Sequence, residues 1–135
     1  MPQYRCQVQE GRYSKEVKAQ LAREITSVHC ELTGAPAHFV HVLFSEFGAG
    51  DWFTAGEQSR FSIVNAFIRC GRSDEQKRQL LVKISREWSR ITGQSEREIV
   101  VTVTEIRFEH WMEAGQLMPQ PGGEREWFAR LGVKI

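Results

Sequence analysis

Several features that would place this 135-residue chain in a specialised class are scarce or missing. Its three cysteines are odd in number and widely spaced, with no CxxC pair, so neither a disulfide framework nor a zinc site is expected. We expect Cys6, Cys30 and Cys70 to be small buried apolar residues. No apolar run approaches the roughly 18 residues of a membrane span, and the first residues lack the apolar core of a signal peptide. The sequence therefore predicts a cytoplasmic protein.

An excess of charge of one sign is also lacking. The chain has 18 Lys and Arg against 17 Asp and Glu, a net charge of +1, and no basic block stands out. Neither nucleic acid nor an anionic membrane is therefore an expected partner. With 41% hydrophobic and 26% charged residues, the composition and length predict one ordinary globular domain, residues 1–135.

What the chain does contain is an internal repeat at an offset of 59 residues. Residues 14–34 and 73–93 are identical at eight of 21 positions. In both segments apolar residues recur at three- and four-residue steps, which predicts two helices. Each segment opens with a serine that can cap the helix start and ends with a glycine that suits a left-handed cap. These capping residues are Ser14 and Ser73, Gly34 and Gly93.

Each predicted helix is flanked by two apolar, β-prone segments. These strand candidates are residues 2–8, 38–44, 60–68 and 98–104. A helix between two strands implies a parallel strand pair with a right-handed crossover. The two units, approximately 2–46 and 60–105, therefore predict an α/β (α+β) fold, a four-stranded mixed sheet with two helices on one face.

The remaining segments connect and extend these units. The Gly-rich residues 47–59 join the two halves, and residues 106–135 form a C-terminal tail outside the repeat. The stretch PQPGG, residues 119–123, cannot be helical, and we expect it to start a segment that wraps a neighbouring subunit, anchored by Trp127 and Phe128. Because one face of the sheet is left uncovered, a symmetric oligomer is expected.

The first two residues, Met-Pro, carry a chemical possibility. Methionine aminopeptidases remove Met1 when the next residue is small, and proline qualifies. Removal would leave a secondary amine at Pro2, which no other residue can supply; the alternative is a chain start without chemical consequence. An α-amino group has a pKa of roughly 7.7–8.0. Burial beside cations would lower that pKa and give a base, whereas a dominant carboxylate would keep the amine charged as an acid.

A duplicated β-α-β chain that begins Met-Pro resembles the tautomerase superfamily, whose members use an amino-terminal proline in catalysis. The stretches TSVHCELTG, IRCGRS and WMEAGQLMPQPGGEREWF make the cis-3-chloroacrylic acid dehalogenase group the closer match. The resemblance covers nearly the whole chain. It implies the fold inferred above, assembled as a homotrimer, and no cofactor or metal is expected.

The resemblance also implies roles for individual residues. The catalytic proline corresponds to Pro2 and the histidine of the first helix to His29. The two substrate-binding arginines correspond to Arg69 and Arg72, and the water-activating glutamate to Glu113. These residues imply a small carboxylate as substrate.

The position of the two arginines is compatible with this role, although without the resemblance it would favour a solvated surface pair. Arg69 and Arg72 lie between the third predicted strand and the N-cap of the second helix, which is a natural anion site. If the two units run antiparallel, the start of the first strand lies near the end of the third, and Pro2 approaches the arginines. The alternative is a pair of solvated surface arginines.

The histidine and the glutamate each have a structural alternative. His29 lies beside the apolar stripe of its helix, and its repeat counterpart is Trp88, which indicates a buried position. A neutral His29 could donate a hydrogen bond to substrate, or it could be a satisfied core residue. We expect Glu113 in a short helical stretch, sharing a face with Glu109 that could simply be solvated. Three other histidines match no motif and are expected to be structural or exposed: His38, His41 and His110.

One position departs from the dehalogenase pattern. Where that group has an active-site tyrosine, this chain has Thr102, whose hydroxyl reaches less far. Water addition should suffer, whereas tautomerisation needs little more than a positioned amine and an anion clamp. The sequence therefore predicts an isomerase that interconverts enol and keto forms of small 2-oxo acids, with weak dehalogenase or hydratase activity. The alternatives are a hydrolytic cis-3-haloacrylate dehalogenase and a non-catalytic oligomeric binding protein.

Overall fold

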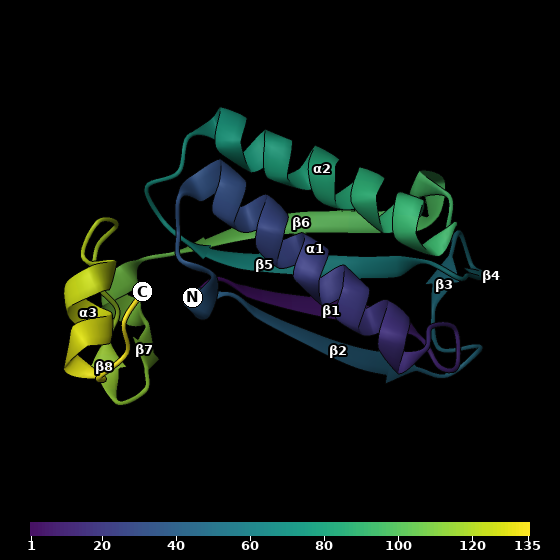
Figure 1. The fold of residues 1–135 in the computed structure, drawn as a ribbon. Coiled ribbons are helices and arrows are strands. Elements are labelled where there is room, and N and C mark those ends of the chain that lie inside the picture. The colour runs from purple at the N-terminus through teal and green to yellow at the C-terminus, as the bar shows by residue number, and fades with distance from the viewer.

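Four strands form one mixed sheet in the order β2-β1-β5-β6 (Figure 1). The computed structural model describes residues 1–135. The strands are β1 (Gln3–Gln9), β2 (His41–Phe47), β5 (Ser62–Arg69) and β6 (Ile99–Ile106). β1 pairs with β2 and β5 with β6 in parallel, while the central pair β1 and β5 is antiparallel. The predicted sheet is thus confirmed.

The two long helices, α1 (Lys15–Thr33) and α2 (Asp74–Thr92), lie on the same face of the sheet (Figure 1). The side chain of Ser14 accepts a hydrogen bond from the backbone of α1, and Ser73 does the same for α2. Gly34 and Gly93 end the helices with φ of 71° and 75°, conformations that favour glycine. The predicted caps are therefore confirmed. None of the helices combines the length and the apolar character that a membrane span requires.

The core lies between the helices and the sheet. Alternate residues of β1, namely Tyr4, Cys6 and Val8, are fully buried against α1 and α2. Cys6 therefore matches its prediction, whereas the other two cysteines are only half-buried. The opposite face of the sheet has no helix over it and leaves Leu43 of β2 57% exposed.

Two short hairpins extend the repeat beyond the expected boundary at residue 105. β3 (Phe53–Thr54) pairs with β4 (Glu57–Gln58), and β7 (Met112–Glu113) pairs with β8 (Gln116–Leu117). Each hairpin turns through an Ala-Gly pair with positive φ at both residues, as a two-residue turn between twisted strands requires. The two turns are also 59 residues apart, so the segment after β6 repeats the linker after β2 and does not lie wholly outside the repeat.

Single-turn 3₁₀ helices precede the second strand of each unit and the second hairpin. They are η1 (Ala37–Phe39), η2 (Glu96–Glu98) and η3 (Phe108–His110). The strand expected over residues 38–44 therefore begins later, at His41, because residues 37–39 form a helical turn.

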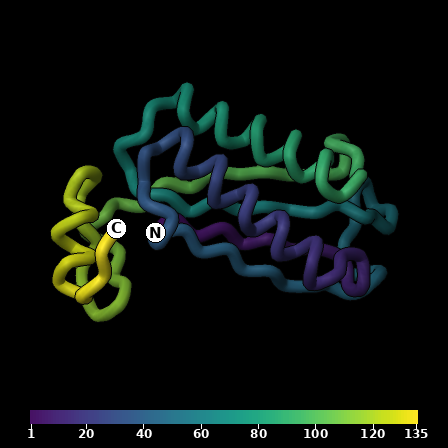
Figure 2. Tube along the Cα trace, in the orientation of Figure 1, coloured from purple at the N-terminus to yellow at the C-terminus, as the bar shows by residue number.

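The tail packs on its own chain. Helix α3 (Glu124–Arg130) lies beyond the end of the sheet at which the chain starts, and both termini lie there (Figure 2). Trp127 and Phe128 are buried in an apolar cluster with Met1, Phe39 and Met118. Within this structure the two aromatic residues anchor the tail to the start of the same chain, so the expectation that they anchor it to a neighbour is wrong.

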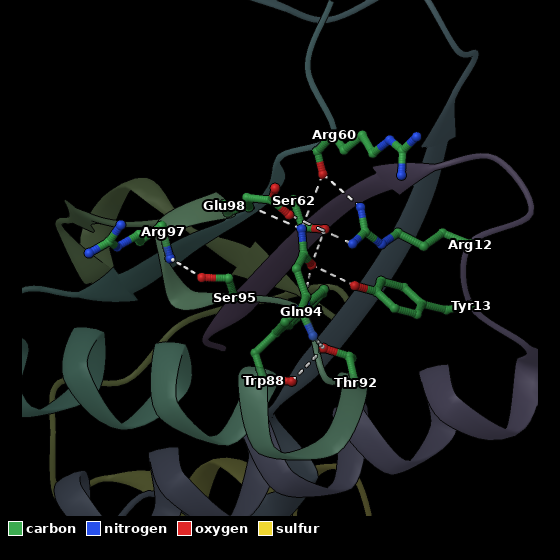
Figure 3. Close-up of polar contacts among 10 residues, drawn as sticks. All are labelled: Arg12, Tyr13, Arg60, Ser62, Trp88, Thr92, Gln94, Ser95, Arg97 and Glu98. Atoms are coloured by element: carbon green, nitrogen blue, oxygen red, sulfur yellow. Dashed lines mark hydrogen bonds and ion pairs between the residues drawn. The ribbon is translucent and has the colours of Figure 1, made fainter.

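A hydrogen-bond network around Gln94 closes the opposite end of the sheet (Figure 3). The side-chain oxygen of Gln94 accepts from the hydroxyl of Tyr13 at 2.5 Å, from Ser62 at 2.8 Å and from the indole of Trp88 at 3.1 Å. Its side-chain nitrogen donates to two backbone carbonyls, at 3.1 and 3.2 Å. One buried amide thus satisfies polar groups from both repeat units.

Replacing this amide should destabilise the whole domain. In Gln94→Ala the buried hydroxyl and indole donors lose their acceptor, which should lower the free energy of unfolding by about 2–4 kcal/mol. Urea denaturation measures the change. Gln79→Ala, which removes an exposed glutamine from α2, should change the free energy by less than about 0.5 kcal/mol. Equal effects of the two substitutions would show that the network contributes nothing.

Candidate active site

The terminal amine of the chain is buried at the end of the sheet. In this structure it belongs to Met1, and Pro2 is buried directly behind it. The amine donates a hydrogen bond to the backbone carbonyl of Phe39 and lies 3.4 Å from Oε2 of Glu113. Burial lowers its pKa to about 6, although the carboxylate of Glu113 acts in the opposite direction, and the charge of Arg69 lowers it further. The Met1 amine is therefore mostly neutral at pH 7.

Glu113 reaches the amine from a β-hairpin and not from a helix. It lies on β7, and the turn after it brings β7 back as β8. The expectation that Glu113 shares a helical face with Glu109 is wrong, because only residues 108–110 are helical and Glu109 is exposed. The hairpin instead holds the Glu113 carboxylate, 23% exposed, between the terminal amine and the imidazole of His41.

His41 is a site residue that the sequence did not reveal. Its Nε2 lies 2.6 Å from Oε1 of Glu113, while its backbone N–H donates to the carbonyl of Pro2 at 3.0 Å. The same residue thus contacts both the catalytic candidate at the chain start and the carboxylate beside it. The signal that could have found it is the parallel pairing of β1 and β2, which places the first residue of β2 opposite Gln3.

His29 is buried on the inner side of α1, as expected, and its ring is oriented by Tyr4. The hydroxyl of Tyr4 lies 2.7 Å from Nδ1 of His29. Burial, together with the positive charges of Arg72, the terminal amine and Arg69, lowers the pKa of His29 to about 3, so its imidazole is neutral. Burial raises the pKa of Tyr4, which keeps its proton.

The tautomer of His29 follows from this contact. A buried hydroxyl needs an acceptor, and Nδ1 of His29 is the one within reach of Tyr4. Tyr4 therefore donates to Nδ1, and the neutral ring carries its own proton on Nε2. That N–H has no hydrogen-bond partner within the chain, so it can donate to a bound molecule.

The two arginines of the predicted anion clamp differ in their surroundings. Arg69 is buried, with Nη1 donating to the carbonyl of Pro119 at 2.7 Å and Nη2 to Glu124 of α3 at 2.6 Å. Arg72 donates only to the carbonyl of Thr33, at 2.9 Å, and has no carboxylate within ion-pair distance. Arg72 is therefore the guanidinium with free hydrogen-bonding capacity, while Arg69 already binds an internal carboxylate.

Thr102 does not meet these residues within one protomer. It lies on β6 between Val101 and Val103, which pack towards the helices, so its side chain points to the uncovered face. There it accepts a hydrogen bond from Asn65 at 2.6 Å. The strand register also places it opposite Asn65, four residues before Arg69. Contact between Thr102 and a substrate is thus not supported by the fold of a single chain.

The internal repeat gives this group of residues a counterpart at the other end of the sheet. At an offset of 59 residues, Phe61 corresponds to Pro2, Trp88 to His29 and Tyr13 to Arg72. The counterparts carry no free amine, imidazole or guanidinium, and the Gln94 network fills that end. No three His, Cys, Asp or Glu side chains come together as a metal site would require. Only the end that holds the chain start combines a terminal amine with the histidine and the two arginines.

Comparisons with known proteins agree with the duplicated fold. A family model described as "Putative oxalocrotonate tautomerase enzyme" matches residues 1–130. A 2-hydroxymuconate tautomerase of Bacillus subtilis (strain 168) is 46% identical over 46 residues, 34% of this chain and 74% of that protein. A probable tautomerase of Streptococcus pyogenes serotype M1 is 37% identical over 62 residues, 46% of this chain and 100% of that protein. A complete relative thus matches less than half of this chain, in accord with two β-α-β units.

Solved structures cover the chain as a whole. N1, a member of the cis-3-chloroacrylic acid dehalogenase family, has a TM-score of 0.89 at 33% identity, over 94% of this chain and 90% of that one. Ps01740 has a TM-score of 0.80 at 38% identity, over 82% of this chain and 99% of that one. A fused 4-OT solved as a symmetric trimer shares the fold, with a TM-score of 0.81 at 22% identity, over 90% and 98%. Since the family model spans nearly every residue, this chain belongs to the tautomerase superfamily, in the family described by that oxalocrotonate tautomerase model.

Proposed function

We propose that the chain, once Met1 is removed, is an isomerase that interconverts enol and keto forms of small 2-oxo acids, with the amine of Pro2 as its base. The observation that supports this most directly is the burial of Pro2 behind the Met1 amine, whose own pKa burial lowers to about 6. A neutral amine can accept a proton near pH 7, and general bases act best with a pKa near the working pH.

The neighbouring residues supply the rest of the reaction. The amine of Pro2 takes the proton of the enol hydroxyl and, as an ammonium, returns it to the adjacent carbon, so that the keto form leaves and the amine is regenerated. Arg72 binds the substrate carboxylate through its free N–H groups. The Nε2–H of His29 donates to the oxygen on which negative charge develops. No water or cofactor is consumed.

Addition of water is the second candidate, and Glu113 is the residue that favours it. The Glu113 carboxylate, which lies 3.4 Å from the Met1 amine in the unprocessed chain, could take a proton from water while a protonated Pro2 gives one to carbon. The proton on Glu113 could then return to Pro2. Because Thr102 lies on the other face of the sheet, no hydroxyl from this strand fixes the water in one protomer, and we expect hydratase or dehalogenase activity to be weak.

We also propose that the chain assembles as a homotrimer. The uncovered sheet face has no helix over it and leaves Leu43 57% exposed, so a neighbouring copy could bury it. The fused 4-OT relatives have been solved as trimers. A neighbouring copy on this face would also lie over Thr102.

Removal of Met1 should decide activity. Chain processed to Pro2 should convert the enol of phenylpyruvate, whereas chain prepared with methionine aminopeptidase inhibited should be inactive, since its position-2 nitrogen is an amide without basicity. Intact mass identifies each form and ultraviolet absorbance follows the enol. Full activity from wholly Met1-retained protein would contradict the proposed function.

Replacing Arg72 and replacing Arg69 should impair different properties of the protein, catalysis and stability respectively. Arg72→Ala should lower kcat/KM by roughly ten- to a hundredfold, because a charge-assisted hydrogen bond to the substrate carboxylate is lost. Arg69→Ala removes a buried guanidinium and the partner of the half-buried Glu124, and should lower the free energy of unfolding by about 2–4 kcal/mol. Kinetics and urea denaturation on both variants separate the two effects. The reverse pattern would assign the substrate carboxylate to Arg69.

Tyr4→Phe should impair catalysis through His29. The variant keeps the aromatic ring but cannot donate to Nδ1, so the Nε2–H tautomer is no longer favoured and kcat should fall about tenfold with KM changed less than about twofold. Nitrogen NMR of His29 should show protonation at Nε2 in the wild type and a mixture in the variant. Tyr13→Phe removes the hydroxyl that donates to Gln94 at the other end of the sheet and is the control. An equal loss of kcat in both variants would rule out this role for Tyr4.

A further inference from the structure

We infer that the substrate occupies the space that Met1 fills in this structure, and that it is a monocarboxylate whose remainder is uncharged and apolar, preferably aromatic. This inference rests on the proposed function for the position of the reacting amine. It adds to that function the substrate class, which the family assignment leaves open.

The direction of one covalent bond places the reacting atoms. In the unprocessed chain the nitrogen of Pro2 is bonded to the carbonyl carbon of Met1. When Met1 is removed, the nitrogen becomes a tetrahedral secondary amine, whose lone pair and proton point to either side of the former bond, towards the space that Met1 occupied. An atom that exchanges a proton with Pro2 must therefore lie where Met1 was.

The surroundings of Met1 then describe the pocket. Met1 is only 3% exposed, so the space that it leaves is largely enclosed. The side chain of Met1 packs among four apolar residues, of which three are aromatic. They are Phe39, Met118, Trp127 and Phe128. Enclosed apolar space of this kind binds apolar groups and not water.

The charges around this space admit one carboxylate. Arg72, whose charge helps to lower the pKa of His29, is the cation with free donors. Arg69, whose guanidinium lies over the ring of Phe39, already pairs with Glu124. The end of the space nearest the Met1 amine is lined by acceptors, the carboxylate of Glu113 and the carbonyl of Phe39. A second carboxylate on the substrate would either meet these acceptors or enter the aromatic cluster without a partner. Burying an unpaired charge is costly, so dicarboxylates should bind weakly.

Binding of two matched, unreactive acids tests this inference without using catalysis. The probes are 3-phenylpropanoate and 3-(4-carboxyphenyl)propanoate, which differ by one carboxylate, and calorimetry measures both. Processed chain should bind the monoacid at least about tenfold more tightly than the diacid, and Met1-retained chain should bind the monoacid at least about tenfold more weakly than processed chain does. Equal binding of the monoacid to both forms, or equal binding of the two acids, would overturn the inference.

Substitutions on one hairpin provide the matched variants. Met118→Ala shortens a side chain that contacts Met1, whereas Leu117→Ala shortens its neighbour, which is 60% exposed. Met118→Ala should weaken binding of 3-phenylpropanoate about five- to tenfold, and Leu117→Ala should leave it unchanged. Met118→Leu, which conserves volume, should bind the acid nearly as the wild type does and covers the case in which the alanine variant does not fold. Equal effects at the two positions would place the pocket elsewhere.

Failure of the proposed function would be recognised separately. If processed chain binds the monoacid selectively but does not convert the enol of phenylpyruvate, the inferred pocket is supported and the proposed reaction is wrong. If processed chain converts 2-hydroxymuconate, a diacid, as fast as the enol of phenylpyruvate, the proposed reaction is supported and the proposed substrate class is wrong.

Discussion

Burial of the chain's terminal amine is the constraint on which the rest of the site depends. The antiparallel pairing of β1 with β5 brings the start of the chain beside the end of β5, where Arg69 lies. The tail then covers this end with Met118, Trp127 and Phe128. Enclosure lowers the pKa of the amine to about 6, because the charged form loses its hydration. The same enclosure keeps His29 neutral, so that it can serve as a donor without carrying charge.

Duplication of the β-α-β unit explains the fold, and the differences between the two units explain why the site forms at only one end of the sheet. The two units share helix length, caps, crossover and hairpin turn, and both place an ion pair between helix and strand, Lys18 with Glu46 and Lys77 with Glu105. Only one unit can begin with a free amine. At the other end an amide, Gln94, satisfies the polar groups that face it, and the polar network there stabilises the fold instead of binding a ligand.

The fold could be predicted from the sequence because its signals are local and occur twice. Helix periodicity, serine and glycine caps and flanking β-prone runs each predicted an element that the structure contains. The site was less predictable where it depends on distant contacts. The hairpin position of Glu113 could have been found only by aligning WFTAG with WMEAG, and the pairing of Arg69 with Glu124, 55 residues away, leaves no local pattern. The placement of Thr102 on the uncovered face follows from strand register, which motif comparison ignores.

The proposed reaction requires that the terminal amine of the processed chain is a base at neutral pH. Titration of the Pro2 nitrogen by NMR in isotopically labelled, processed protein measures this directly. We predict a pKa below 7, because burial should shift the Pro2 amine in the direction in which it shifts the Met1 amine, whose pKa falls to about 6. Above that pKa the amine is neutral and can accept the enol proton, so kcat/KM should rise with pH through the same range. A pKa of about 9 or higher would show that Glu113 outweighs burial, that Pro2 is an acid at neutral pH, and that the proposed tautomerase mechanism is wrong.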